Sequence, residues 1–281
     1  MSRDRRRLPR DLVTRVGIAL SAVFVVVAAG ADVIAPHDPF AFVAEPFEAP
    51  SGAHLFGTDD LGRDIFSGVV HGARTSLVVG LGVAIASLLI GVTIGATAGF
   101  FGGWVDDLLM RFTELVQVLP RFFLALTVVA LWGPNLANLV AVLALTSWEL
   151  TARVTRAGVL SVRERDYVRA ATALGVSRLA ALRRHVVPNA AAPAIALATL
   201  QVGSAILVEA GLSFLGLGDP DAISWGYLLD NAQAFVRRAW WMAVFPGVAI
   251  ALAVLGVNLL GDGFVERTDG RSATQFTGGR R

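Results

Sequence analysis

Cysteine and lysine are both missing from this 281-residue chain, so all 24 of its strongly basic side chains are arginines. The absence of cysteine excludes disulfides, thiolate metal sites and cysteine nucleophiles. The absence of lysine excludes the phosphate-binding lysine of a P-loop and the amine of a Schiff base. The four histidines are not spaced as metal ligands, so neither a metal nor a cofactor is expected.

Charge is scarce as well: 16% of the residues are charged, 55% are hydrophobic, and the mean hydropathy is +0.64. This composition is too apolar for an ordinary soluble domain. Several uncharged runs reach the roughly 18–20 residues that a helix needs to cross the hydrocarbon core. We therefore predict an all-α integral membrane protein. The basic pI of 9.9 is explained by arginines that flank the apolar runs as topology signals, so no nucleic-acid partner is expected.

The first apolar run covers residues 16–35 and follows an arginine-rich tail, residues 1–15. Because positive charge marks the cytoplasmic side, the tail is predicted to be cytoplasmic and the polar segment 36–74 extracytoplasmic. Ala29-Gly30-Ala31 resembles a cleavage site, so a removed signal peptide is the alternative. We interpret the run as a retained transmembrane helix.

A second transmembrane helix is predicted between Arg74 and Asp106, where no charge occurs. Glycines recur there at positions 91, 95 and 99, the four-residue spacing that lets another helix backbone approach closely. A helix that only faces lipid is the alternative. We predict that the glycines pack against another helix.

The uncharged region from Phe122 to Trp148 fits either one transmembrane helix or two, divided at residues 133–135. One helix would make five in all and would place the segment 153–189 outside. That segment holds eight arginines, so this topology violates the positive-inside rule. Two helices keep the segment in the cytoplasm, which favours a total of six with both termini inside.

The last five helices form a predicted core, residues 75–264, followed by a cytoplasmic tail, residues 265–281. Pro120 is expected to kink the third helix. The core contains the basic loop, residues 155–189. The expected helix positions are 75–105, from about 104 to the break at 133, 136–152, 190–215 and 239–261.

The basic loop is predicted to form one or two short helices between Arg165 and Leu182, with a break at Gly175. Small side chains on it would let a helix sit deeply in a groove, while the arginines around them pair with acidic groups of a partner. An amphipathic helix lying on anionic lipid is the alternative. The residues alone leave both interpretations open.

The loop contains Arg169-Ala170-Ala171, then three residues, Gly175, nine residues, and His185-Val186-Val187-Pro188. This pattern resembles the EAA loop of binding-protein-dependent ABC importer permeases. The resemblance implies a coupling helix that docks on the ATP-binding subunit. The implied contact residues are Arg165, Tyr167, Arg169, Ala170, Ala171, Ala173, Leu174, Gly175 and Pro188. The family usually has glutamate where this chain has Arg169, so we hypothesise a partner of reversed charge there.

Further motifs occur in order between Leu55 and Gly263 and resemble the dipeptide/oligopeptide/nickel permeases, C-type subunit. They are LFGTDDLGRD at 55–64, GFFGGWVD at 99–106, GLSFLGLG at 211–218, SWG at 224–226 and NLLGDG at 258–263. Glu149 follows Trp148 where such relatives often have proline, which predicts a straighter fourth helix. The resemblance implies a subunit of the cell membrane with no catalytic site of its own.

The implied function is a translocation path for di- or oligopeptides in an ATP-driven importer. The expected partners are a B-type permease in a heterodimer, two ATP-binding subunits, an extracytoplasmic binding protein and membrane lipid. Import of nickel or another small solute is the alternative within the subfamily. A stand-alone secondary transporter would show internal repeats, and an intramembrane enzyme would show a catalytic motif; neither is evident in the sequence.

Two other groups of residues are candidates for function. By the resemblance Glu209 lies near the translocation path, and the alternative is a buried carboxylate held by hydrogen bonds. In the predicted extracytoplasmic segment, a compact polar turn either forms a salt-bridged cap or contacts the binding protein, and we favour the cap. The residues of this turn are Thr58, Asp59, Arg63 and Asp64.

Overall fold

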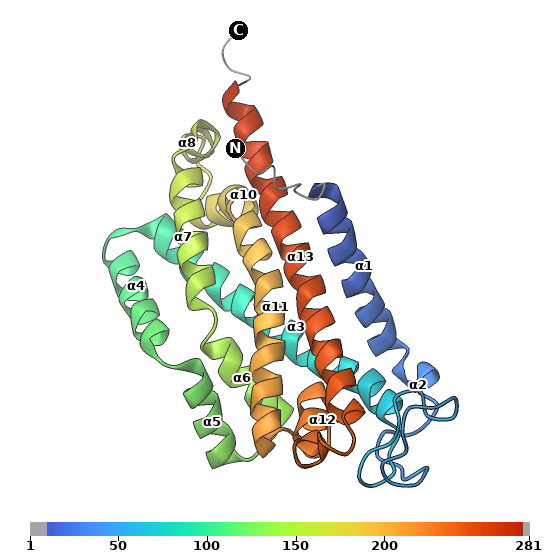
Figure 1. The fold of residues 1–281 in the computed structure, drawn as a ribbon. Coiled ribbons are helices and arrows are strands. Elements are labelled where there is room, and N and C mark those ends of the chain that lie inside the picture. The colour runs from blue at the N-terminus through green and yellow to red at the C-terminus, as the bar shows by residue number, and fades with distance from the viewer. Residues whose placement is uncertain (1–9, 278–281) are drawn as a thin grey trace, which may run out of the picture.

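The computed structural model describes residues 10–277, and the side chains of residues 12–263, as a bundle of helices (Figure 1). Four helices in this part are long and apolar enough to cross a membrane, which supports the predicted all-α membrane fold. They are α1 (Arg10–Ala29), α3 (Ile65–Phe101), α11 (Ala192–Leu212) and α13 (Trp241–Thr277). α1 begins and α13 ends at the same end of the bundle.

α4 (Gly103–Val118) and α5 (Arg121–Trp132) form one bent element, with an angle of 76° between them. The break falls at Pro120, which has no backbone N–H and disfavours a helical residue before it, so the predicted kink is confirmed. α5 is followed by a turn in which Gly133 has φ +85°, and then by α6 (Leu136–Leu145). The region 122–148 therefore holds two helical elements.

The prediction of a straighter fourth helix is wrong, because the chain leaves the helix between α6 and α7 (Glu149–Arg163). The indole of Trp148 donates to the carbonyl of Leu145 at 2.9 Å, and the hydroxyl of Thr146 donates to the carbonyl of Val142 at 2.8 Å. These side chains satisfy carbonyls at the end of α6, so the break leaves fewer polar groups unpaired in an apolar layer.

The glycines of α3 pack against α7, as their spacing predicts. A Cβ atom built on Gly91 would lie 2.6 Å from the Cβ of Thr151, and one on Gly99 would lie 2.9 Å from the carbonyl oxygen of Arg156. A Cβ on Gly95 would overlap the carbonyl of Ala152. Glycine at these positions therefore sets the distance between the two helix backbones.

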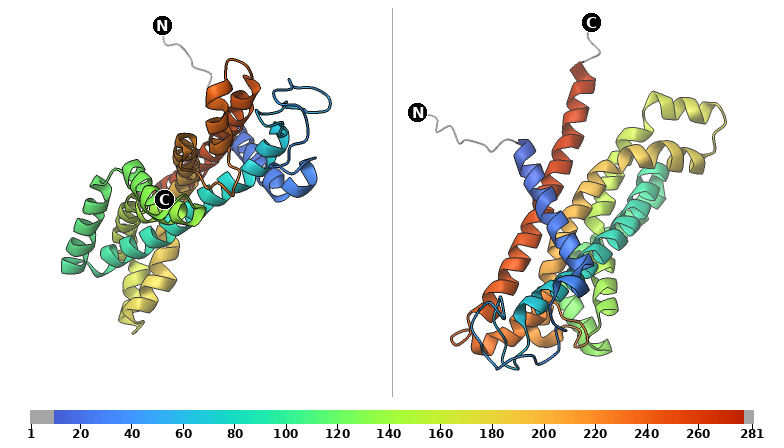
Figure 2. Two further views of the ribbon diagram at one scale, coloured as in Figure 1. Left: turned by 90° about the horizontal axis from the view of Figure 1, so that it is seen from below. Right: turned by 90° about the vertical axis from the view of Figure 1, so that its right-hand side faces the viewer.

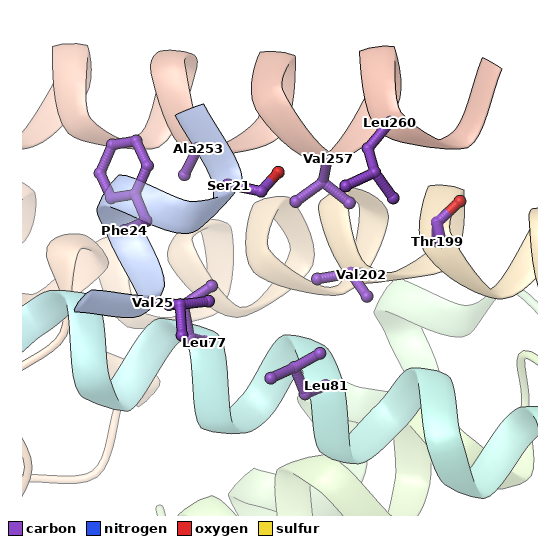
Figure 3. Close-up of a pocket in the computed structure, with 10 residues that line it drawn as sticks. All are labelled: Ser21, Phe24, Val25, Leu77, Leu81, Thr199, Val202, Ala253, Val257 and Leu260. Atoms are coloured by element: carbon purple, nitrogen blue, oxygen red, sulfur yellow. The ribbon is translucent and has the colours of Figure 1, made fainter. Parts of the chain in front are cut away.

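α1 packs along α13 by the same means. A Cβ on Gly17 would lie 2.6 Å from the backbone nitrogen of Leu260, and one on Gly256 would lie 2.8 Å from the Cβ of Leu20. Between α1, α3, α11 and α13 lies an apolar cavity of about 150 Å³, lined by side chains such as Phe24 and Val202 (Figure 3). α1 is thus an integral part of the bundle in this structure.

The segment before α3 closes one end of the bundle, beside α12 (Trp225–Ala232) (Figures 1 and 2). Asp59 accepts from the Nε of Arg63 at 2.5 Å, and Arg63 also donates to the hydroxyl of Tyr227 in α12 at 3.2 Å. Gly62 has φ +76°, a conformation that suits glycine. The polar turn is therefore a folded cap with a buried ion pair.

The helices extend beyond several predicted bounds. Asp64 caps α3 by accepting from the backbone nitrogen of Ser67 at 2.8 Å, so the second long helix starts at Ile65 and includes Arg74. Arg74 binds Asp32 of α2 (Ala31–Ile34) at 2.9 Å, and its guanidinium lowers the pKa of that carboxyl. The last helix runs through the predicted tail as far as Thr277; residues 1–9 and 278–281 lie outside the described part.

Gly95→Ala is expected to lower the stability of the bundle by about 2 kcal/mol, because the added methyl group forces α3 and α7 apart. Gly247→Ala is the matched control, since a Cβ there meets no atom within 4 Å. Unfolding midpoints in detergent would compare the two. Equal midpoints for the two variants would contradict the packing role of Gly95.

Arg63→Gln is expected to cost about 3 kcal/mol, because it leaves the buried carboxylate of Asp59 without its cation. Arg74→Gln breaks an exposed pair with Asp32 and should change the stability little. Denaturant titration in mixed micelles measures both. A loss no larger for Arg63→Gln than for Arg74→Gln would show that the cap does not depend on its ion pair.

Candidate functional site

α7 runs to Arg163, through the first part of the predicted basic loop, and the rest of the loop forms an arm that projects from the end of the bundle where α13 ends (Figures 1 and 2). It contains α8 (Asp166–Ala173), α9 (Arg178–Ala181), a wider helical turn (Leu182–Val186) and α10 (Val187–Ala190). Gly175 has φ +89° and separates α8 from α9, which confirms the predicted break.

The inner side of the arm is held by an apolar cluster. Val168, Leu182 and Val186 are at most 6% exposed and pack with Val159 and Val162 of α7. Burial of each such side chain contributes about 1.5–3 kcal/mol relative to exposure. The arm is therefore fixed to the bundle through α7, and a force on it is carried into that helix.

The outer side of the arm presents the residues implied by the EAA resemblance. Leu174, at the tip of the arm, is 86% exposed. Its side chain therefore contributes little to packing within this chain and is free to contact a partner. Arg165, Tyr167, Arg169, Ala170, Ala173, Gly175 and Pro188 are exposed too, and Ala171 is partly buried. The structure thus brings these residues together on one accessible element.

Arg169 donates to Glu164 at 2.6 Å on the surface of the arm. The guanidinium of Arg169 lowers the pKa of the Glu164 carboxyl. Because the folded-state pKa is depressed, the small stabilisation is present at neutral pH and is lost as the pH falls through the lowered pKa. The arm therefore carries a charge pair that a partner can compete for.

Glu209 of α11 lies in the interior with no exposed surface. Its carboxylate accepts hydrogen bonds from Ser213 at 2.8 Å and from Ser76 of α3 at 3.3 Å, and Ser224 also hydrogen-bonds to it. The geometry in this conformation is that of a buried, hydrogen-bonded carboxylate. A place beside the translocation path stays a prediction.

The polar turn of the cap uses its side chains internally. Thr58, Asp59, Arg63 and Asp64 are at most 9% exposed, and His54 lies 3.1 Å from Asp64. The hydroxyl of Thr58 donates to the carbonyl of Glu45 at 2.7 Å. This geometry fits the cap interpretation. Within the described residues, no three His, Asp or Glu side chains are placed to hold a metal ion.

Sequence reasoning missed one polar cluster inside the bundle. Arg121 at the start of α5 forms an ion pair with Glu149 at the start of α7. Gln201 of α11 donates to the carbonyl of Ser147 at 2.6 Å and to the hydroxyl of Thr151 at 3.3 Å. The sequence offered one sign of this cluster: Arg121 follows Pro120, and Glu149 lies where relatives often have proline. The two side chains come into contact only because the α4–α5 element is bent.

A second polar region lies between α4 and α7, toward the arm. Arg156 donates through two nitrogens to Asp106, each at 2.6 Å, and Arg153 donates to Gln117 at 2.9 Å. The two arginines border a cavity of about 400 Å³ whose lining includes Glu114. α7 therefore carries polar contacts along its whole length, from Glu149 to the arm.

Comparison with solved structures supports the fold. A crystal structure described as an amino acid ABC transporter with histidines aligns with a TM-score of 0.54 at 17% identity. The alignment covers 72% of this chain and 95% of that one. At this identity the likeness concerns the fold alone.

Comparison of sequences gives stronger relationships. The chain is 37% identical to the dipeptide transport system permease protein DppC of Alkalihalophilus pseudofirmus, over 94% of this chain and 88% of the relative. It is 40% identical to the di/tripeptide transport system permease protein DppC of Pseudomonas aeruginosa, over 90% of this chain and 86% of the relative. Residues 91–273 match the model of the binding-protein-dependent transport system inner membrane component family. The chain belongs to this family and is an integral membrane permease subunit of the ABC transporter type.

Proposed function

We propose that this subunit forms a translocation path for di- or oligopeptides in an ATP-driven importer. The exposed arm, anchored on α7, is the observation that carries the proposal, because the residues that the EAA resemblance implies for docking are accessible on it. The names of the relatives, a dipeptide and a di/tripeptide permease, point to peptides as the substrate class.

The proposed assembly contains a related B-type permease, two ATP-binding subunits and an extracytoplasmic binding protein. ATP hydrolysis then takes place on the ATP-binding subunits. Closure of these subunits pushes the arms of the two permeases, and the bundle switches between two states with different access. The binding protein delivers the peptide to the outward-open state.

The proposed topology has six transmembrane helices with both termini in the cytoplasm. The bent α4–α5 element is the third and the α6–α7 element is the fourth. This assignment is supported by the alternating direction of the elements (Figure 1) and by the eight arginines between residues 153 and 189. The arm then lies in the cytoplasm and the cap outside.

Leu174→Ser is expected to reduce peptide uptake roughly tenfold, because the loss of one buried leucine from an interface weakens docking by about that factor. Uptake of a labelled dipeptide into proteoliposomes that hold the complete transporter measures this. Val33→Ser is the control, because Val33 of α2 is also an apolar side chain, 89% exposed, but lies at the cap end of the bundle. Wild-type uptake and subunit assembly in Leu174→Ser would contradict docking through the arm.

Arg169→Glu tests the hypothesis of a partner with reversed charge. It places like charge against an acidic group on the ATP-binding subunit, so ATP hydrolysis should uncouple from uptake. Arg169→Gln, which removes the charge without reversing it, should have a smaller effect. The number of ATP molecules hydrolysed per peptide imported is the measurement. An unchanged ratio in Arg169→Glu would refute the hypothesis.

A further inference from the structure

α4 carries charged side chains at the depth of the membrane. Asp107, Arg111 and Glu114 recur at helical spacing, so they share one face of α4, and all three are exposed in this subunit. We call this the polar face. α4 lies between the two ends of the bundle (Figure 1) and forms one candidate membrane span with α5. Charged side chains at such a depth are costly in lipid and usually face other protein or water.

Glu114 lies deep in this span. It comes about three turns after Gly103, where the span begins, or roughly 16 Å along the helix axis at 1.5 Å per residue. Half of the hydrocarbon core of a bilayer measures about 15 Å. A carboxylate on a short side chain does not reach the headgroups from there, as the longer side chain of an arginine can. Contact with headgroups therefore does not explain the position of Glu114.

The charges of this region are not neutralised within the subunit. In the part of the chain that the structure describes, the side chains of Arg111 and Glu114 form no ion pair or hydrogen bond. Arg153 of α7 donates to the amide oxygen of Gln117 at 2.9 Å and has no carboxylate partner there either. The buried carboxylate of Glu209, by contrast, is surrounded by hydroxyl groups. Solvation of the polar face is therefore left to groups outside this chain.

A polar cavity of about 400 Å³ lies beside the polar face, between α4 and α7. Its lining includes Thr113 and Glu114 of α4 and Arg153 and Arg156 of α7. A water molecule takes up about 30 Å³ in the liquid, and cavities with several polar groups hold water. This cavity has room for a cluster of water molecules, which can solvate charges that lipid does not.

The arginines of this cavity belong to the helix that carries the arm. Arg153 and Arg156 lie on α7, which ends at Arg163, where the arm begins. Arg156 also joins α7 to α4 through its two hydrogen bonds to Asp106. Displacement of the arm therefore acts on both sides of the cavity.

The other exposed side of α4 is apolar. Trp104, Leu108 and Leu115 are all more than half exposed. Successive residues of a helix point about 100° apart, so each of these leucines points away from the charged residue just before it. One helix thus presents a polar and an apolar side at the same level of the membrane. The depth of a residue can therefore be separated from the side on which it lies.

We propose that the polar face of α4, together with Arg153 and Arg156 of α7, is a water-lined wall of the translocation path. Water solvates the charged side chains, and the peptide passes along them, whereas the apolar side of α4 is shielded from water. This inference rests on the proposed function, because it names the surface that the proposed substrate passes. A dry contact of the same face with the partner permease is the alternative.

The test uses the absence of cysteine from this chain. In the complete transporter, Glu114→Cys and Leu115→Cys each give this subunit a single thiol, one on each side of α4. Inside-out membrane vesicles are treated with a membrane-impermeant methanethiosulfonate, once cationic and once anionic, and labelling of this subunit is followed with time. A thiol reacts as the thiolate, which forms in water and is disfavoured in apolar surroundings. Glu114→Cys should therefore react at least roughly tenfold faster with both reagents, the factor for one unit of pKa.

A second pair of variants repeats the comparison at another level of α4. Asp107→Cys and Leu108→Cys again place one thiol on each side, and they carry the test if Glu114→Cys does not assemble. The treated transporters are then reconstituted in proteoliposomes, and uptake of a labelled dipeptide is measured. Modification of a thiol on the polar face should block uptake by the variant that carries it. The cysteine-free subunit, treated in the same way, controls for effects of the reagents on the other subunits.

The outcomes are distinct. Slow labelling of both members of each pair overturns the water-lined wall and leaves a dry contact with the partner permease. Fast labelling of both members overturns the division of α4 into a wet and a dry side. Fast labelling of Glu114→Cys with unchanged uptake overturns its place on the path. Fast labelling confined to the polar face, with loss of uptake, supports the inference. If the labelling is so confined but the unmodified transporter imports no dipeptide, the proposed peptide import is overturned instead.

Discussion

The close contact between α3 and α7 is the constraint on which the rest of this structure depends. Three glycines of α3, at 91, 95 and 99, bring its backbone against α7, where any side chain would overlap. In an apolar layer, where burial from water does not drive helices together, such backbone proximity and its dispersion contacts supply the attraction. The position of α7 is therefore set by the absence of side chains on its neighbour.

α7 connects the arm with the polar groups inside the bundle. It starts at Glu149 beside Arg121, and it ends at Arg163, where the arm begins. Val159 and Val162 near its end pack with Val168 and Val186 of the arm. A rigid helix held along its length transmits displacement at one end to the other. Under the proposed function, this gives a physical route from movement of the arm to the polar cluster inside the bundle.

Most polar groups inside the bundle have a hydrogen-bond partner in the fold, which offsets the free energy that burial away from water costs. Glu209 is surrounded by serine hydroxyls from several elements, which together replace water. The break before α7 is stabilised by the indole of Trp148 and the amide of Gln201. Among the described residues, five buried side-chain atoms lack a partner, two of them the Oε2 of Glu149 and the Oε1 of Gln201 beside the Arg121–Glu149 pair.

Much of the molecule was predictable from sequence, because hydropathy, arginine distribution and local signals act over short distances. The apolar runs, the kink at Pro120, the break at Gly175, the glycine spacing and the EAA motif each depend on neighbouring residues. The straight fourth helix was predicted wrongly, since side chains of Thr146 and Trp148 stabilise a break that no local rule demanded. Only the tertiary structure decided which charges meet. Arg121 and Glu149, 28 residues apart, come into contact because one helix bends by 76° and another is interrupted.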